Sequence, residues 1–210
     1  GREMHSWIIK LSLPEMDDPF GSTLVDMYGK CGLLEEAQKV FDKMPIQDVV
    51  LWSALIGGVA FEGEIMRVFD LFETMLMKGI QPDKIILLSI LTMCTHAGLV
   101  NAGTLYFVSM KEEFGISQSI EHHNCIVDLL SRAGQLEQTQ EILDNMPFHP
   151  HIVMLTIVLS ACQKWGIVEL GEGGFGYVLQ LDDEEAAAYV IMSNIYAHAG
   201  FTCDPFPILQ

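Results

Sequence analysis

The sequence predicts an all-α fold in which helix-turn-helix repeats stack into an α-solenoid, and two regular series of residues are the basis of this prediction. Six glycines close similar three-residue phrases at intervals of 31 to 36 residues, namely Gly32, Gly63, Gly98, Gly134, Gly166 and Gly200. Four methionines keep step with the first four glycines, namely Met44, Met75, Met110 and Met146. Self-similarity with a period of about 20–50 residues is typical of solenoids, in which each repeat is one supersecondary unit.

Residues 49–83 show the plan of one repeat. Apolar residues recur at helical spacing until Gly63 ends the pattern, and a second apolar series then runs from Val68 to Met75. A spacing of three to four residues indicates an amphipathic helix, and glycine or proline after such a series marks its end. Pro82 stands at that place here. The segment therefore predicts two helices joined by a glycine turn.

The same plan assigns the rest of the chain in order. Residues 1–17 are expected to be the second helix of a truncated repeat. The next 134 residues are expected to form four full repeats, which are residues 18–48, 49–83, 84–119 and 120–151. A further hairpin is expected at residues 152–185, the start of another at 186–200, and a divergent tail at 201–210.

Two positions in each hairpin predict how the hairpins pack. Residue 20 of each is small or compact, namely Ala37, Val68, Gly103, Thr139 and Gly171. Residue 24 of each is large and apolar, namely Phe41, Phe72, Phe107, Leu143 and Phe175. Small residues let two helices approach closely, and large ones fill the space between neighbouring hairpins. Because one hairpin cannot bury its apolar stripe alone, stacking is expected to hold the array together.

These phrases resemble the pentatricopeptide repeat family, and more narrowly its plant branch with alternating repeat lengths, the PLS subfamily. Residues 24–32 and 37–45 resemble the short repeat of that branch, and residues 49–83 its 35-residue repeat. Residues 152–185 resemble the extension (E) motif that follows the repeats, and residues 186–200 the start of a second one. The resemblance implies a right-handed α-solenoid.

The resemblance also implies sequence-selective binding of single-stranded RNA, with one base read by each repeat. Residue 5 and the last residue of a repeat would select the base, which here assigns Ser22, Asp48, Ser53, Asp83, Asn124 and His151. Residue 2 would pack on the base, which assigns Val50 and Ile85. Read from 5′ to 3′, residues 18–151 are expected to prefer guanine, guanine, any base and a pyrimidine. Ser, Asp and Asn also favour helix caps and turns, so a purely structural role stays open for each.

The net charge of −17 is unusual for a protein that binds nucleic acid, because such proteins carry a basic footprint. Residue 13 of most hairpins is nevertheless a cation, and we assign phosphate contacts to Lys30, His96, Arg132 and Lys164. A cation at the end of a helix also complements the helix dipole. The alternative function is therefore a protein-interaction scaffold that has lost RNA binding.

Residues 171–178 match the G-x-G-x-x-G-x-V loop of kinases, but the companion kinase motifs are absent and too few residues follow. The histidine pairs 122–123 and 149/151 have no zinc-ligand spacing around them, and no deaminase signature H-x-E with P-C-x-x-C occurs. We therefore expect no enzyme activity, no metal and no cofactor. Glycines inside residues 168–181 are expected to make that helix the weakest of the array.

Five scattered cysteines form no paired framework, which fits a reducing compartment, and no apolar run is long enough for a membrane span. By resemblance the chain would act in a mitochondrion or chloroplast, with any targeting segment upstream. Its expected role is a fragment of a C-to-U RNA-editing specificity factor. Its partners would be single-stranded organellar RNA and a deaminase-domain protein recruited through the extension motif.

Overall fold

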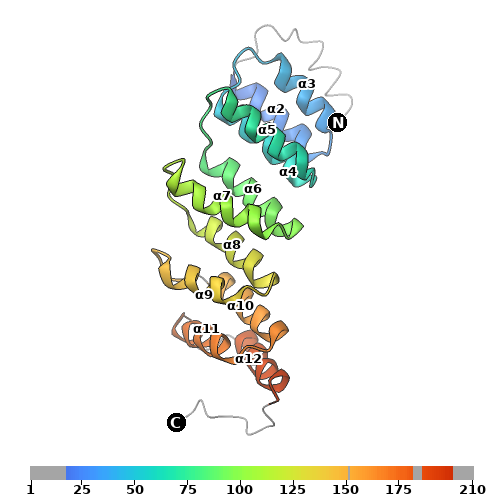
Figure 1. Cartoon of the computed structure of the whole chain (residues 1–210). Helices are drawn as coiled ribbons and strands as arrows, with labels where there is room; N and C mark the ends of the chain where they lie inside the picture. Colours follow the sequence, from blue (N-terminus) through green and yellow to red (C-terminus); the bar gives the residue numbers. More distant parts are fainter. Residues whose placement is uncertain (1–17, 151, 182–185, 201–210) are drawn as a thin grey trace. The chain divides into compact units, whose positions relative to one another are not determined.

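The computed structural model describes residues 18–150, 152–181 and 186–200 (Figure 1). Within these ranges the chain forms eleven α-helices and no strand, so the all-α prediction is confirmed. The helices are α2 (Asp18–Lys30), α3 (Leu34–Lys43), α4 (Val49–Phe61), α5 (Ile65–Met77), α6 (Lys84–Ala97), α7 (Val100–Glu112), α8 (Ile120–Arg132), α9 (Leu136–Asn145), α10 (Ile152–Trp165), α11 (Val168–Leu181) and α12 (Ala186–His198). The predictions for residues 1–17, His151 and residues 201–210 lie outside the described residues.

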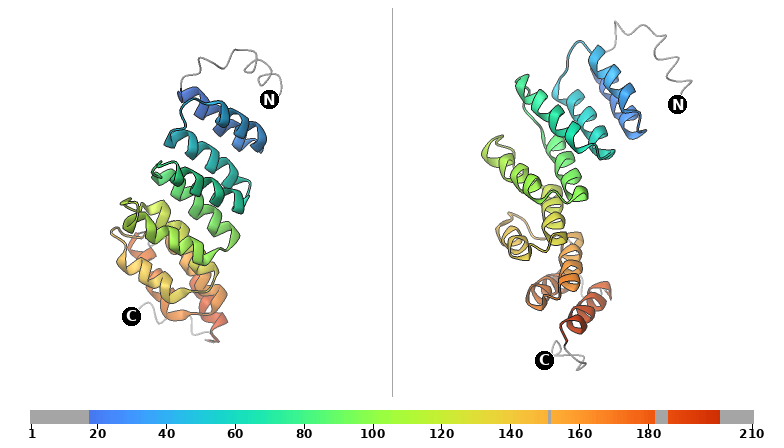
Figure 2. Two further views of the ribbon diagram at one scale, coloured as in Figure 1. Left: turned by 45° about the horizontal axis from the view of Figure 1, so that its top comes forward. Right: turned by 45° about the vertical axis from the view of Figure 1, so that its right-hand side comes forward.

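The chain divides into two compact units. One comprises residues 1–93 with 108–117, and the other residues 94–107 with 118–210, so α6 and α7 contribute to both. In the first unit α2 packs against its hairpin partner α3 and against α4, which in turn packs against α5. In the second unit α8 packs against α9 and α10, and α10 packs against α11 and α12 (Figures 1 and 2). Within these units α2, α8 and α10 each contact both their own second helix and the next first helix, which is solenoid packing.

The glycine series marks the turns inside the hairpins. All six glycines that predicted the period have φ between 67° and 80°, a backbone conformation in which a side chain is strained. After Gly32 the N–H of Leu33 donates to the carbonyl of Tyr28 at 2.9 Å. The residues that follow Gly63, Gly98, Gly134 and Gly166 make the equivalent hydrogen bond, in which the N–H group donates to the carbonyl group five residues earlier. This is the Schellman ending of a helix, and it satisfies carbonyl groups that the helix leaves unpaired.

The core follows the two packing positions read from the sequence. Phe41 and Phe72 are each 2% exposed, and Phe107 and Phe175 are also buried. The ring of Phe41 meets Trp52 edge-on, with 4.6 Å between the ring centroids. Leu143 differs from the other members of its series, because it is only partly buried.

Helices α2 and α4 approach each other closely at Gly29 and Gly58. A Cβ atom built on Gly58 would lie 2.7 Å from the Cα of Gly29, which is closer than real Cβ contacts. Neither helix can therefore carry a side chain at this point without moving. A Cβ atom on the neighbouring Gly57 would meet only Ser89 Oγ, at 3.6 Å.

Replacing Gly58 with alanine is expected to lower the free energy of unfolding by about 1–3 kcal/mol, because overpacking outweighs the gain in helix propensity. Gly57→Ala is the matched control, and we expect it to raise stability by up to about 1 kcal/mol. Urea unfolding followed by circular dichroism measures both. Equal shifts in the two variants would contradict the close approach of α2 and α4.

Candidate nucleic-acid interface

Three of the first helices, α4, α6 and α10, expose an aliphatic side chain close to their N-terminal ends. Val50 of α4 is 54% exposed and Ile85 of α6 is 63% exposed, which matches their assignment to the base-packing position. The structure adds Val153 of α10, which is 52% exposed and occupies residue 2 of its hairpin. Counting from Ile152 in the sequence would have found Val153, and it would have found the exposed Thr156 at residue 5.

Asp48 and Asp83 cap the N-terminal ends of α4 and α6. Asp48 Oδ1 accepts a hydrogen bond from the N–H of Leu51 at 2.9 Å. Asp83 Oδ1 accepts from the N–H groups of Ile85 at 3.0 Å and Ile86 at 2.9 Å. The structural role is therefore present in both residues, as is usual for aspartate at this position. Within the described part of the chain, no hydrogen bond is made to the second oxygen of either carboxylate.

The residues assigned to position 5 differ in their exposure. Ser22 is half-buried, whereas Ser53 is buried with 8% of its surface exposed. Asn124 is half-buried, and its Oδ1 atom is buried without a hydrogen bond from the described residues. The assignment of these side chains to base recognition stays a prediction, as does that of His151.

Two of the four cations assigned to phosphate are already paired. Lys30 Nζ lies 2.7 Å from Asp26 Oδ2, and Arg132 Nε lies 2.7 Å from Asp128 Oδ1, each one helical turn away. The hydrogen bond from Arg132 to Asp128 raises the pKa of the guanidinium further. All four partners are on the surface or close to it, so each pair contributes little to stability. Each pair does lower the positive charge that Lys30 or Arg132 offers to an anion.

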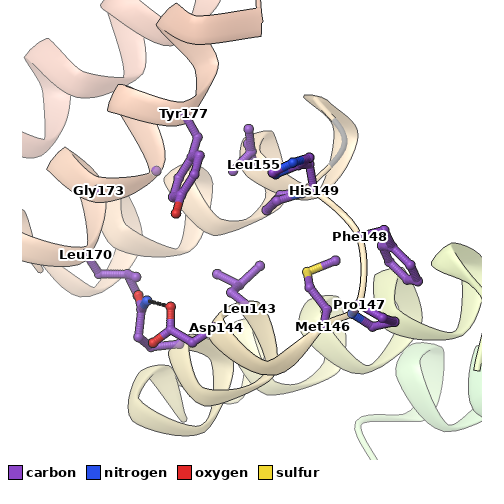
Figure 3. A pocket seen from close by; sticks show the side chains of 13 residues that line it. Leu143, Asp144, Met146, Pro147, Phe148, His149, Leu155, Leu170, Gly173 and Tyr177 are labelled. Carbon is purple, nitrogen blue, oxygen red and sulfur yellow. Dashed lines mark hydrogen bonds between the residues drawn. The ribbon is translucent and has the colours of Figure 1, made fainter.

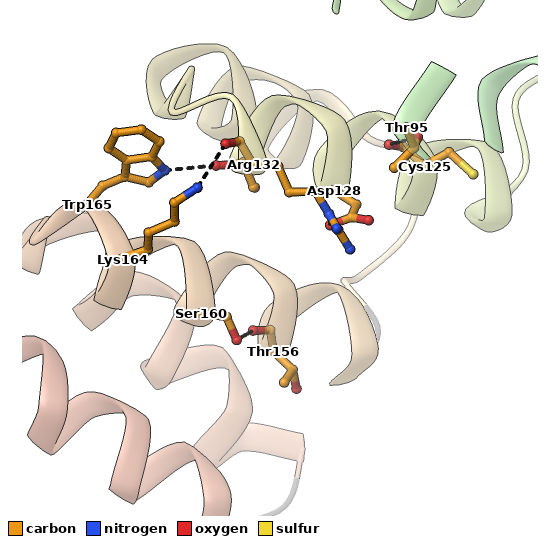
Figure 4. A network of polar contacts seen from close by, with 9 residues as sticks. Thr95, Cys125, Asp128, Arg132, Thr156, Ser160, Lys164 and Trp165 are labelled. Atoms are coloured by element: carbon orange, nitrogen blue, oxygen red, sulfur yellow. Dashed lines mark hydrogen bonds and ion pairs between the residues drawn. The ribbon is translucent and has the colours of Figure 1, made fainter. Parts of the chain in front are cut away.

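Lys164 lies in a different environment at the end of α10 (Figure 4). Its Nζ atom donates to the carbonyl of Arg132 at 3.4 Å and lies 4.7 Å from the centre of the Trp165 ring. Trp165 Nε1 donates to the carbonyl of Ser131 at 3.1 Å. Side chains of α10 thus satisfy carbonyl groups at the C-terminal end of α8. Within the described ranges, Lys164 forms no ion pair with a carboxylate.

A groove of about 290 Å³ lies between α8 and α10. Arg132 and Lys164 contribute its cations, Thr156 and Ser160 its hydroxyl groups, and Asp128 a carboxylate. His96, the remaining predicted cation, is exposed in the last turn of α6. The structure therefore brings two of the predicted phosphate contacts together in one concave surface.

Glu121 places a negative charge at residue 2 of the repeat at 120–151. The hydroxyl of Ser119 donates to its carboxylate, and this bond lowers the pKa of Glu121. The exposed carboxylate therefore remains ionised at neutral pH. It is a poor surface for a nucleobase beside a phosphate chain.

His123 of α8 is buried between two aromatic rings. The ring centroids of Phe107 and Phe148 lie 5.0 Å and 4.9 Å from that of His123, both edge-on. Its Nδ1 donates to the carbonyl of Ser119 at 3.0 Å. Burial lowers the pKa of His123 below its ordinary value of 6.5, although the bond to Ser119 opposes the shift.

Stability is therefore expected to fall as the pH drops below about 6.5, because the unfolded chain takes up a proton that the folded chain resists. The His123→Phe variant keeps an aromatic ring between Phe107 and Phe148 but cannot be protonated. It is expected to lose less stability than the wild type between pH 7.5 and 5.5. Urea unfolding at both values measures the difference. Identical pH dependence in the two proteins would show that His123 is not the titrating group.

None of the helices in the described ranges is both long and apolar enough to cross a membrane. Among the same residues no three His, Cys, Asp or Glu side chains gather as metal ligands.

The helical repeat of this chain also occurs in known proteins. The family model of the PPR repeat matches residues 22–48 and 50–80. A pentatricopeptide repeat-containing protein of Arabidopsis thaliana is 40% identical over 185 residues, which are 88% of this chain and 29% of that protein. The chain therefore carries repeats of the pentatricopeptide repeat (PPR) family.

Two further PPR relatives from Arabidopsis thaliana carry an organelle in their names. A mitochondrial one is 35% identical over 203 residues, covering 96% of this chain and 44% of its own length. A chloroplastic one is 38% identical over 200 residues, covering 95% of this chain and 23% of its own length. The chain thus spans less than half the length of each of these relatives.

Solved PPR structures superpose on the chain at low identity. The PPR protein PPR10 from maize has a TM-score of 0.67 at 18% identity, over 95% of this chain and 29% of PPR10. PPR10 in complex with an 18-nt psaJ RNA element has a TM-score of 0.65 at 17% identity, over 86% and 28%. The PPR domain of Arabidopsis thaliana protein-only RNase P 1, in complex with tRNA, has a TM-score of 0.71 at 14% identity, over 83% and 96%. These likenesses confirm the α-solenoid fold.

Proposed function

We propose that this PPR chain binds single-stranded RNA along the exposed faces of its first helices. One observation carries the proposal: the exposed Val50 and Ile85 each follow a carboxylate, Asp48 and Asp83, that caps its helix with one oxygen only. An aliphatic surface can pack on the face of a base while the second oxygen accepts from its edge. Proteins read single-stranded RNA through such packing and edge contacts.

A concave surface with two cations supports the same function. The groove with Arg132 and Lys164 then offers charge for the phosphate chain. The structure of PPR10 in complex with an 18-nt psaJ RNA element supports RNA as the partner.

We infer the finer features of the function from the repeat motifs in the sequence. We assign the chain to the PLS branch, with an E motif at residues 152–185, and to an organellar factor that directs C-to-U editing. Relatives named mitochondrial and chloroplastic support an organelle as its place of action. A deaminase-domain protein would supply the chemistry, because the chain itself is assigned a binding role and no catalysis.

Fluorescence anisotropy with a labelled 12-nucleotide RNA tests the proposal. The oligonucleotide carries guanine, guanine, any base and a pyrimidine at its centre, and its control has both guanines replaced by adenine. We expect tighter binding of the first RNA, with an affinity that falls as salt rises because phosphate contacts release counterions. If a folded sample binds no RNA at low salt, the proposal is wrong and the second candidate function is favoured.

That second candidate is a protein-interaction scaffold. It is favoured by the net charge of −17 and by the exposed carboxylates that the second helices carry. Such a surface repels RNA and attracts cationic partners. A folded chain that binds no RNA but binds a cationic protein would support it.

A further inference from the structure

A second concave surface lies between the second helices α9 and α11, beside Leu155 of α10 (Figure 3). It encloses about 340 Å³, which is at the lower end of the volumes that ligand sites occupy. Apolar side chains supply much of its wall, namely Leu143, Met146, Phe148, Leu170 and Tyr177. Asp144 and His149 stand among them.

The cleft is bordered by an unusual residue at one packing position of the repeat and by a glycine of the facing helix. Leu143 takes the place that Phe41 and Phe72 fill in other hairpins, but it is only partly buried, whereas they are 2% exposed. Gly173 lies opposite, and a Cβ atom built on it would meet no atom within 4 Å. One wall of the cleft is therefore bare helix backbone.

Asp144 is the carboxylate in the lining of the cleft, and the two helices that border the cleft carry further negative charge. The second helices α9 and α11 expose five carboxylates and contain no Lys or Arg, and these carboxylates belong to Glu137, Glu141, Asp144, Glu169 and Glu172. A phosphate chain would be repelled here, so nucleic acid is excluded as the occupant. A cationic segment of protein would be attracted.

We propose that the cleft between α9 and α11 docks a cationic segment of a partner protein. An apolar or aromatic side chain of that segment enters between Leu143 and Tyr177, beside Gly173. Lys or Arg residues next to it pair with Asp144 and Glu141. A buried apolar anchor supplies most of the affinity of such an interface, and exposed charge pairs at its rim mainly raise the rate of association.

The site is independent of RNA binding, because it uses the second helices and leaves the groove at Arg132 and Lys164 free. A partner seated in the cleft therefore leaves that groove open to RNA. The two sites can be tested separately on one protein.

Two glycines of α11 give a matched pair of variants. Gly173→Leu fills the cleft, whereas Gly176→Leu places the same side chain on the same helix outside the lining. Cβ atoms at both positions have no neighbour within 4 Å, and leucine favours a helix more than glycine does. Both variants are therefore expected to fold.

The probe is a library of displayed 12-residue peptides, selected on the full 210-residue wild-type chain. We expect the selection to enrich peptides with Lys or Arg beside a leucine or an aromatic residue. One such peptide, made synthetically, is expected to bind wild type and Gly176→Leu alike and Gly173→Leu at least tenfold more weakly. Asp144→Asn should weaken it severalfold at low salt, and RNA binding by Gly173→Leu should be unchanged.

Three results would overturn the proposal. One is a selection without enrichment or with enrichment of acidic peptides. Another is equal binding of the chosen peptide to Gly173→Leu and wild type. The third is a dimer in sedimentation velocity that disappears in Gly173→Leu, because a second copy of the chain would then be the occupant.

Discussion

Replacing Lys164 with alanine is expected to weaken RNA binding more than replacing Lys30 or Arg132. The structure gives the reason, since Lys30 and Arg132 are each held 2.7 Å from an aspartate and Lys164 forms no ion pair among the described residues. The variant in which Lys30, Arg132 and Lys164 are all replaced by alanine is expected to show a weaker salt dependence. The slope of log affinity against log salt should become less steep by at most about 2, because each phosphate contact to a single strand contributes about 0.7. Binding to all sequences should weaken alike.

Replacing the aspartates that pair with these cations is expected to have the opposite effect on RNA binding. Asp26→Asn and Asp128→Asn remove the carboxylates that pair with Lys30 and Arg132, so both are expected to strengthen RNA binding, by up to about fivefold. Two unit charges about 4 Å apart interact by about 1 kcal/mol in water, which sets this limit. Folding should hardly change, because exposed ion pairs contribute about 0–1 kcal/mol.

Glu73→Gln is the matched control, because it removes one negative charge from an exposed position on the second helix α5. Anisotropy titrations at several salt concentrations measure all the variants. If Glu73→Gln strengthens binding as much as Asp128→Asn does, the effect belongs to the net charge and the local pairing has no role. If Lys164→Ala binds as wild type does, Lys164 makes no contact with phosphate.

The fold could be predicted because its signal is local and repeated. Gly32 and its five counterparts all adopt a positive φ, so a turn that only glycine fits easily recurs along the sequence. The burial of Phe41 and Phe72 follows from the helical spacing of apolar residues in the same way. The partial exposure of Leu143 did not follow, since it depends on the glycines of a different helix facing it across the cleft.

The candidate site could be predicted in part. The spacing of Asp26 and Lys30, and of Asp128 and Arg132, already implied ion pairs, because residues four apart meet on one face of a helix. The hydrogen bonds from Lys164 and Trp165 to carbonyl groups of α8 join residues that are more than thirty positions apart in the sequence, so no local sequence pattern predicts them. Sequence spacing places cations on helices, but their neighbours in space decide how much charge they offer.

Replacing Asp83 with asparagine is expected to shift the base preference of one repeat from guanine towards adenine. Asp83 holds the N-terminal end of α6 through Oδ1, which accepts from the N–H groups of Ile85 and Ile86, at 3.0 Å and 2.9 Å. Asparagine keeps that oxygen and is as good a cap as aspartate. The substitution therefore changes only the second atom, from an oxygen that accepts to a nitrogen that donates.

The expected direction follows from the edges of the bases. A carboxylate oxygen can accept from guanine N1–H but meets another acceptor at adenine N1, and an amide group reverses this. A good base contact is worth about 1–3 kcal/mol of discrimination, so the ratio of affinities should change by about tenfold or more at this position. Affinity for unrelated RNA should hardly change, because no phosphate contact is altered.

Four oligonucleotides that differ only at the second guanine of the expected site measure the base profile of both proteins. Asp48→Asn provides the matched comparison, because Asp48 caps α4 in the same way and should change the profile one base upstream. Asp83→Ala separates the two roles, since it removes the cap and is expected to cost about 0.5–2 kcal/mol of stability. Identical base profiles for wild type and Asp83→Asn would show that Asp83 only caps α6, and base selection by this repeat would then have to be assigned to other residues.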